Sequence, residues 1–180
     1  MSIIKDMLGA GESVFRNELA LDYSYVPKLV PYREREQRSI AAAMRPLFQG
    51  HNGRNVLVFG PSGVGKTVAC RHLMDEIEEQ TDDIVPFYVN CWKHNTSFRI
   101  LLEMCEVIGY RFTQNKRTDE LFAVIKQQLN KKAAVFVFDE VDKIENLDLI
   151  YNIMEDIYKK SGVLITNYKE WFMELDSRVK

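Results

Sequence analysis

Hydrophobic residues follow two patterns along the chain: short unbroken apolar runs, and longer segments in which they recur every three or four positions. Runs of strand length occupy four segments, residues 55–59, 84–90, 133–138 and 162–166. Helical spacing occupies four more, residues 68–77, 97–108, 121–129 and about 147–159. Another helix is expected to begin at Arg33 and to end near Pro46. Strands and helices therefore alternate from residue 55 onward, which predicts an α/β fold.

The run at residues 133–138 indicates how the strands are packed. It is apolar at successive positions, which is typical of a strand that is covered on both faces in a parallel sheet. The order of elements, β-α-β-α-α-β-α-β, then predicts a three-layer α/β domain with right-handed connections. Pro86 lies inside the second run and indicates an edge strand or a bulge, because proline cannot donate a backbone hydrogen bond.

The turn between the first strand and the next helix carries the strongest chemical signal. Its sequence matches G-x-x-x-x-G-K-S/T, the phosphate-binding loop of P-loop NTPases, and the required strand and helix flank it. Lys66 is expected to reach the terminal phosphates, and Thr67 to offer its hydroxyl to Mg²⁺. The alternative is a glycine-rich turn without a ligand. The expected nucleotide-binding residues of this segment are Gly60, Pro61, Ser62, Gly63, Val64, Gly65, Lys66, Thr67 and Val68.

Polar residues also follow the third and fourth strands. Asp139 is expected to hold Mg²⁺, directly or through water, and Glu140 to orient and deprotonate the attacking water. Asn167 is expected to bind the γ-phosphate or the water, because ligand groups gather at the carboxyl ends of parallel strands. The alternatives are acids that only end a strand at the solvent edge, and an asparagine that only forms a turn.

Composition limits the number of domains, the binding partners and the cellular compartment that can be expected. The 180 residues suit one domain, with an irregular arm over residues 1–22 and the nucleotide-binding domain over residues 23–180. The net charge of -2 gives no general affinity for polyanions, although a local basic patch can still bind one. The three cysteines, an odd number without metal-type pairing, favour a reducing intracellular compartment. Neither a membrane-spanning apolar run nor a signal peptide is found, so no membrane partner is expected.

These motifs together resemble an AAA+ ATPase, and more narrowly the archaeal-type family of origin-recognition-complex and cell-division-cycle replication initiators. The likeness covers the chain from about residue 12 to its end. It rests on Tyr-Val-Pro at 25–27 with Pro-Tyr-Arg-Glu at 31–34, Phe-Asp-Glu-Val-Asp-Lys-Ile at 138–144, and Leu-Asp-Ser-Arg-Val-Lys at 175–180. Many AAA+ groups share the two nucleotide motifs, so the proline-bracketed segment and the Arg-Val-Lys ending are what narrow the family.

The resemblance implies ATP or ADP with Mg²⁺ as cofactors, and it assigns further roles. Val26, Pro27 and Arg33 would line the adenine, the alternative being a segment that packs on the sheet edge without touching a ligand. Arg178 would be an arginine finger that acts on the nucleotide of a neighbouring subunit. The catalytic residues are then Lys66, Glu140, Asn167 and Arg178.

The function that the resemblance implies is that of a replication initiator, which binds ATP, hydrolyses it slowly, and acts in origin recognition and helicase loading. Its partners would be origin duplex DNA and the replicative helicase, on the chromosome in the cytoplasm. Residues 97–118 correspond to the family's DNA-contacting insertion, with Arg111, Lys116 and Arg117 as phosphate contacts unless this loop is only solvated. Two alternatives remain: an AAA+ or signalling ATPase for protein remodelling or regulation, and a non-hydrolysing, nucleotide-dependent assembly module.

We also expect the chain to lack three parts of the family's architecture: the fifth strand, the helical lid and the winged-helix domain. The family's strand order would then leave the strand at residues 55–59 at an open edge of the sheet. Weak turnover and a tendency to self-associate are the expected consequences.

Overall fold

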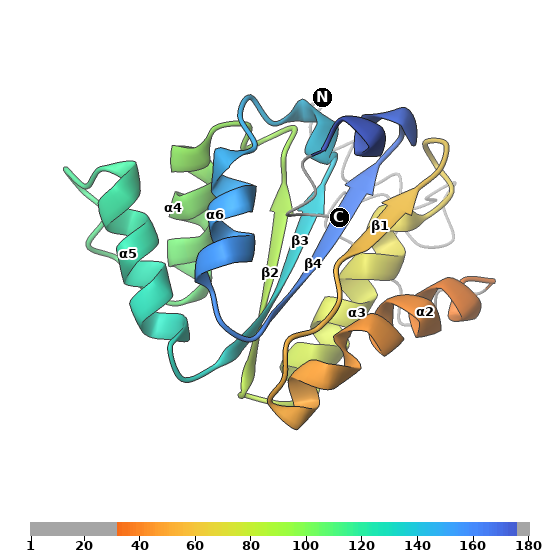
Figure 1. Ribbon diagram of the computed structural model, residues 1–180, viewed down its shortest axis with the longest axis horizontal. Coiled ribbons are helices and arrows are strands. Elements are labelled where there is room, and N and C mark those ends of the chain that lie inside the picture. Colours follow the sequence, from red (N-terminus) through yellow and green to blue (C-terminus); the bar gives the residue numbers. More distant parts are fainter. Residues whose placement is uncertain (1–31, 176–180) are drawn as a thin grey trace, which may run out of the picture.

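The computed structural model describes residues 32–175, which form a parallel sheet of four strands in the order β1-β4-β3-β2 (Figure 1). The strands are β1 (Val56–Phe59), β2 (Ile84–Asn90), β3 (Ala133–Asp139) and β4 (Lys160–Thr166). All pairings are parallel, so the carboxyl ends of the strands meet at one end of the sheet, which is uppermost in Figure 1. The predicted phosphate loop, the acids Asp139 and Glu140, and Asn167 all lie at this end of the sheet.

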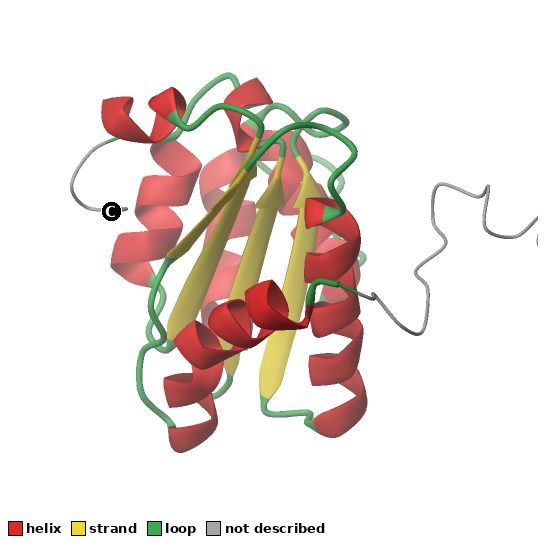
Figure 2. Ribbon diagram, turned by 90° about the vertical axis from the view of Figure 1, so that its right-hand side faces the viewer, coloured by secondary structure: helices red, strands yellow, loops and turns green. Residues whose placement is uncertain are grey.

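Helices cover both faces of this sheet. They are α2 (Glu34–Met44), α3 (Lys66–Gln80), α4 (Ser97–Val107), α5 (Thr118–Leu129) and α6 (Asp148–Asp156), with the short 3₁₀ turns η2 (Arg45–Gln49), η3 (Val141–Lys143) and η4 (Glu170–Glu174). Helices α2 and α3 lie on one face, and α4, α5 and α6 lie on the other (Figures 1 and 2). The predicted three-layer α/β architecture is confirmed.

The side chains of β3 point alternately into two apolar cores. Phe136 and Phe138 are buried in the core under α4, α5 and α6, whereas Val135 and Val137 are buried in the core under α2 and α3. The ring of Phe136 stacks on that of Phe87 in β2, with centroids 5.0 Å apart. Because each face of the strand is covered, an apolar residue is required at every position, as the sequence predicted.

Both outer strands of the described sheet were predicted to lie at an edge, each on different grounds. Strand β2 lies at one edge, which confirms the edge interpretation of Pro86, and its continuous register with β3 shows that no bulge is needed there. Strand β1 lies at the other edge and pairs with β4 alone within residues 32–175. The edge position of β1 agrees with the strand order expected from the family that the sequence resembles.

Two element boundaries were predicted wrongly. Helix α6 ends at Asp156, not near Lys159, because Ile157 already has extended backbone and Lys159 adopts a left-handed φ of 60°. Strand β4 therefore begins at Lys160. By contrast, the helix expected to end near Pro46 does so, since α2 ends at Met44 and the chain there tightens into η2. The proposed arm at residues 1–22 lies outside the described residues.

Candidate nucleotide-binding site

The loop between β1 and α3 has the backbone of an anion-binding turn. Gly63 and Gly65 adopt left-handed φ values of 78° and 88°, which glycine accommodates without steric cost. Gly65 is also the N-cap of α3, so the helix begins at Lys66. The first N–H groups of a helix lack intrahelical partners and carry the positive end of its dipole. A phosphate is therefore well matched to this position.

The Lys66 ammonium connects the phosphate loop to the end of β4. It donates to the carbonyl oxygens of Gly60 and Pro61 at 2.8 and 2.9 Å, and to Asn167 Oδ1 at 2.8 Å. The structure thus brings Asn167 to the loop, as predicted from its place at a strand end. A phosphate bound in the loop would offer this ammonium a charged acceptor in place of neutral ones.

Asp139 lies at the end of β3 with 2% of its surface exposed. Its Oδ2 accepts hydrogen bonds from the Thr67 hydroxyl at 2.7 Å and from the Tyr88 hydroxyl at 2.6 Å. The first contact joins the two predicted metal ligands. Mg²⁺ prefers oxygen ligands and is commonly held by one or two protein groups together with water and phosphate oxygens. A hydroxyl and a carboxylate side by side fit that ion.

Glu140 occupies an unusual backbone conformation directly after the strand. Its φ is 52°, in the left-handed region, and its N–H donates to Asp139 Oδ1 at 3.0 Å. Burial raises the pKa of the Glu140 carboxyl above its ordinary value, and the nearby charges of Asp139 and Asp142 raise this pKa further, while Lys143 and Lys66 oppose the shift. A carboxylate with a raised pKa is a better proton acceptor than an ordinary glutamate.

These groups line one cavity of about 230 Å³ at the carboxyl ends of the strands. Its lining residues are Ser62, Gly63, Gly65, Lys66, Thr67, Val68, Asp139, Glu140, Ile165, Thr166 and Asn167. The predicted phosphate, metal and water-activating groups of this region therefore converge on a single space. The roles of the two acids and Asn167 in binding and hydrolysis stay predictions.

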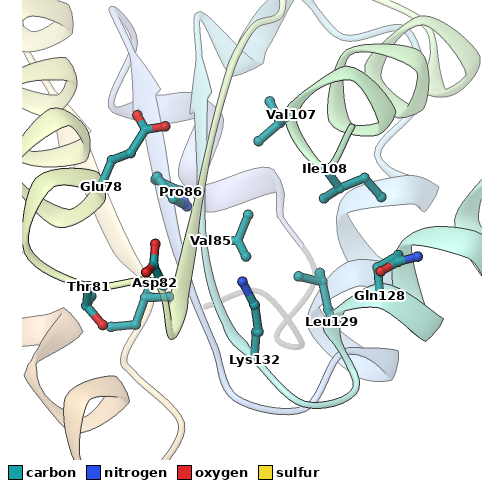
Figure 3. Close-up of a pocket in the computed structure, with 11 residues that line it drawn as sticks. Glu78, Thr81, Asp82, Val85, Pro86, Val107, Ile108, Gln128, Leu129 and Lys132 are labelled. Atoms are coloured by element: carbon teal, nitrogen blue, oxygen red, sulfur yellow. The ribbon is translucent and has the colours of Figure 1, made fainter. Parts of the chain in front are cut away.

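A larger cavity of about 340 Å³ lies beside the amino-terminal end of β2 (Figure 3). It shares no lining residue with the cavity at the carboxyl ends of the strands. Its lining residues are Glu78, Thr81, Asp82, Ile84, Val85, Pro86, Val107, Ile108, Gln128, Leu129 and Lys132. It contains one cation and two carboxylates but none of the predicted site residues. Size therefore does not identify the functional cavity in this protein, whereas the arrangement of chemical groups does.

Of the three residues predicted to line the adenine, Arg33 alone lies within the described residues. It precedes α2 and forms an ion pair with Glu36 at 3.5 Å. A side chain added at Gly65 would meet Arg33 Nε at 4.0 Å, so Arg33 lies beside the phosphate loop. Three other predicted site residues lie outside the described residues: Val26, Pro27 and Arg178.

The predicted DNA-contacting cations lie on and after the loop that follows α4. Lys116 is 3.4 Å from Glu120, and Arg117 is 2.6 Å from Asp119, so acidic neighbours already compensate both charges. The structure gives Arg111 no ion pair within residues 32–175. Contact between this loop and DNA stays a prediction.

Two groups of residues at the site escaped prediction. The first is Tyr88 with Arg71, whose guanidinium carbon lies 4.4 Å from the centre of the tyrosine ring. Tyr88 lies near the carboxyl end of β2, and that position in a parallel sheet was the available signal. The second is the pair of Asp142 and Thr166, in which the Thr166 hydroxyl donates to Asp142 Oδ1 at 2.8 Å.

A family model described as an AAA domain matches residues 49–166, which is more than half of the chain. The chain belongs to this AAA family. The matched segment contains β1 through β4 and with them the whole cavity at the strand ends, apart from Asn167. An AAA domain is in general a nucleotide-binding ATPase domain, which agrees with the chemistry assembled there.

Relatives of this AAA domain narrow the comparison. An ORC1-type DNA replication protein of Desulfurococcus amylolyticus is 31% identical over 189 residues, covering 96% of the chain and 48% of the relative. ORC1-type DNA replication protein 9 of Halobacterium salinarum is 28% identical over 170 residues, covering 92% and 48%. The chain thus spans about half the length of the curated relatives it matches. The predicted resemblance to replication initiators is confirmed.

A solved structure of the Aeropyrum pernix ORC1 protein in complex with DNA has the same fold as this AAA domain. The TM-score is 0.78 with 28% identity, over 92% of the chain and 46% of that protein. A second, Cdc6p from Pyrobaculum aerophilum, has a TM-score of 0.76 at 19% identity, covering 91% and 46%, and supports the fold alone. None of the helices within residues 32–175 is long and apolar enough to cross a membrane.

Proposed function

We propose that this chain is the ATP-binding and ATP-hydrolysing domain of a DNA replication initiator, which acts in origin recognition and helicase loading. The observation that carries the proposal is the convergence of Lys66, Thr67, Asp139, Glu140 and Asn167 on one cavity, in a chain similar to ORC1-type DNA replication proteins over more than nine-tenths of its length. The cavity supports the ATPase part of the proposal, and the relatives support its use in replication.

In the proposed bound state, the residues of the phosphate loop hold the triphosphate. Its backbone N–H groups and the start of α3 surround the phosphates, and Lys66 exchanges its neutral carbonyl acceptors for phosphate oxygens. Thr67 and Asp139 hold Mg²⁺, which neutralises phosphate charge when bound. Val26, Pro27 and Arg33 line the adenine, and the position of Arg33 beside Gly65 supports this role.

Hydrolysis in this proposal depends on two groups at the strand ends. Glu140 accepts a proton from the attacking water, and its raised pKa suits that task. Asn167 orients the water or the γ-phosphate, since its side chain already shares the Lys66 ammonium with the loop. Arg178 acts in trans on the nucleotide of a neighbouring copy, which requires the chains to associate.

The partners are proposed from the relatives. The A. pernix ORC1 protein was solved in complex with DNA, so we propose duplex origin DNA as a partner, with chromosomal DNA in the cytoplasm as the place of action. Arg111 is the strongest candidate for a phosphate contact from the loop after α4, because Lys116 and Arg117 have acidic partners. The replicative helicase is the second proposed partner.

Footprinting of the complete protein on chromosomal origin duplex tests the replication part of the proposal. We expect ATP-dependent protection of a discrete site, and weaker protection with Arg111→Ala. Arg38→Ala, on the exposed surface of α2, is the matched control. ATP hydrolysis without protection of any origin sequence would contradict the initiator function and favour an AAA+ ATPase for remodelling or regulation. Protection with no turnover, unaffected by Glu140→Gln, would favour the non-hydrolysing assembly module.

A further inference from the structure

The short turn that follows the proposed water-activating residue carries a buried carboxylate. The side chain of Asp142, in η3, is only 6% exposed. Its Oδ1 accepts the Thr166 hydroxyl hydrogen bond at 2.8 Å, and its Oδ2 lies 3.0 Å from Lys143 Nζ. A charged group is buried at a large energetic cost unless it is paired and hydrogen-bonded, so this arrangement calls for an explanation.

Lys143 compensates the charge of Asp142 from the surface. Its ammonium lies 5.6 Å from the ring centres of both Trp92 and Tyr168, two exposed aromatic residues. Its contact with the Asp142 carboxylate is the main reason that the pKa of Lys143 is raised. Asp142 thus contacts Lys143 on the solvent side through Oδ2, and contacts Thr166 at the end of β4 through Oδ1.

Thr166 fixes the chain on both sides of Asn167. Its hydroxyl donates to Asp142 and also accepts a hydrogen bond from the Tyr168 N–H at 3.1 Å. Thr166 itself is 1% exposed. The backbone that carries Asn167 therefore turns around one buried hydroxyl, and the Asn167 side chain reaches Lys66 from that turn. Without the hydroxyl, this turn would lose its link to the acidic segment.

We propose that Asp142 is a positioning residue that holds Asn167 in place through Thr166, a role that rests on the proposed ATPase function. Asp142 follows Glu140 by two residues, so the same short turn carries the proton acceptor and the group that orients Asn167. The carboxyl ends of β3 and β4 are thereby kept in a fixed position relative to each other. A misplacement of about 1 Å at a reacting group can reduce the rate about 100-fold, so such a link has kinetic consequences.

Thr166→Val removes the hydroxyl while nearly keeping the shape of the side chain, and it is the central variant of the test. We expect kcat for ATP hydrolysis to fall about 10- to 100-fold with little change in ATP affinity. Thr166→Ser keeps the hydroxyl and should restore most of the lost turnover. Asp142→Asn should also lower kcat, and the combination with Thr166→Val should lose less than the product of the two effects.

Ser161→Ala is the matched control. Ser161 is a fully buried residue of the same strand, and its hydroxyl donates to the Arg54 carbonyl at 2.7 Å, at the end of β4 far from the site. It removes a buried hydrogen bond as Thr166→Val does, so it should lower the melting temperature without lowering kcat. Equal kcat for Thr166→Val and Ser161→Ala would overturn the proposal, even if Asp142→Asn failed to fold.

The side-chain amide signals of Asn167 in a ¹⁵N correlation spectrum make the test independent of catalysis. We expect Thr166→Val to shift or broaden them in the nucleotide-free protein, whereas Ser161→Ala and Thr166→Ser leave them in place. Absent turnover in the unaltered chain would count against the ATPase function, yet this spectrum would still decide the positioning role. Unchanged Asn167 signals in Thr166→Val would refute that role, whatever the turnover.

Discussion

Lys66 donates a 2.8 Å hydrogen bond to Asn167, joining the start of α3 to the residue that follows β4. The contact follows from the strand order, because β1 and β4 are neighbours and parallel strands end at the same end of a sheet. The same ammonium contacts two carbonyl oxygens of the phosphate loop. One cation therefore bridges the loop that would bind phosphates and the side chain that would sense them.

Replacement of the two acids should separate metal binding from water activation. Glu140→Gln keeps the shape and loses the proton acceptor, so hydrolysis should fall about 100-fold or more while ATP still binds. Asp139→Asn removes a charge beside the Thr67 hydroxyl, so its main effect should be weaker Mg²⁺-dependent ATP binding. ATP affinity and turnover, each measured over a range of Mg²⁺ concentrations, distinguish the two. Identical behaviour of the variants would show that the roles are not divided in this way.

The pH dependence of turnover should report the ionisation of Glu140. Its pKa is raised above the ordinary value of 4.5, so kcat should fall on the acid side with a midpoint above 4.5 as the carboxylate is protonated. The residual turnover of Glu140→Gln should lack this acid limb. If the variant kept the same limb, the titration would belong to another group.

The same shift makes a prediction for stability. Glu140 has a higher pKa in the folded state, so the folded form is favoured when the carboxyl is protonated, and this contribution is lost as pH rises through the folded-state pKa. Glu140→Gln should therefore raise the melting temperature at neutral pH. The gain should disappear as the pH is lowered to the ordinary glutamate range, and a gain that is constant with pH would contradict this origin.

Tyr88→Phe should weaken the magnesium site without touching the metal directly. The tyrosine hydroxyl donates to Asp139 Oδ2 at 2.6 Å, and burial together with Asp139 raises its pKa, so it remains a donor. Removing a partner that orients a metal ligand typically lowers metal affinity or activity about 10- to 100-fold. The half-saturating Mg²⁺ concentration for hydrolysis should rise accordingly. Tyr158→Phe, on an exposed tyrosine, is the control, and equal Mg²⁺ requirements for both would exclude this role.

The sequence predicted the parts of the site that are local or that follow from strand order. The phosphate loop is one continuous segment of the sequence, so its motif and the flanking strand and helix can be recognised together. Asp139 and Asn167 could be placed together because they lie at the carboxyl ends of neighbouring parallel strands. The full burial of β3 was likewise visible, since a strand between two helical layers needs apolar residues at successive positions.

The missed features depend on side-chain reach and on backbone detail. Tyr88 and Asp139 lie on adjacent strands, but only the path of the tyrosine side chain brings its hydroxyl to the carboxylate. The hydrogen bond between Thr166 and Asp142 joins a strand end to a turn, and the spacing of hydrophobic residues along the chain gives no sign of it. The end of α6 was hidden because Ile157 continues the apolar pattern as a buried residue in extended backbone.

The affinity of the chain for ATP, measured with and without Lys66→Ala, shows whether the cavity at the strand ends binds nucleotide. The variant loses charge-assisted hydrogen bonds worth about 1.5–3 kcal/mol each, so affinity should fall at least about 10-fold. Its fold should persist, because Lys66 lines a cavity and not the core. Lys132→Ala, which removes the cation of the larger cavity, should bind ATP like the unaltered chain. Unchanged ATP affinity in Lys66→Ala, or its loss in Lys132→Ala alone, would contradict a nucleotide site at the strand ends.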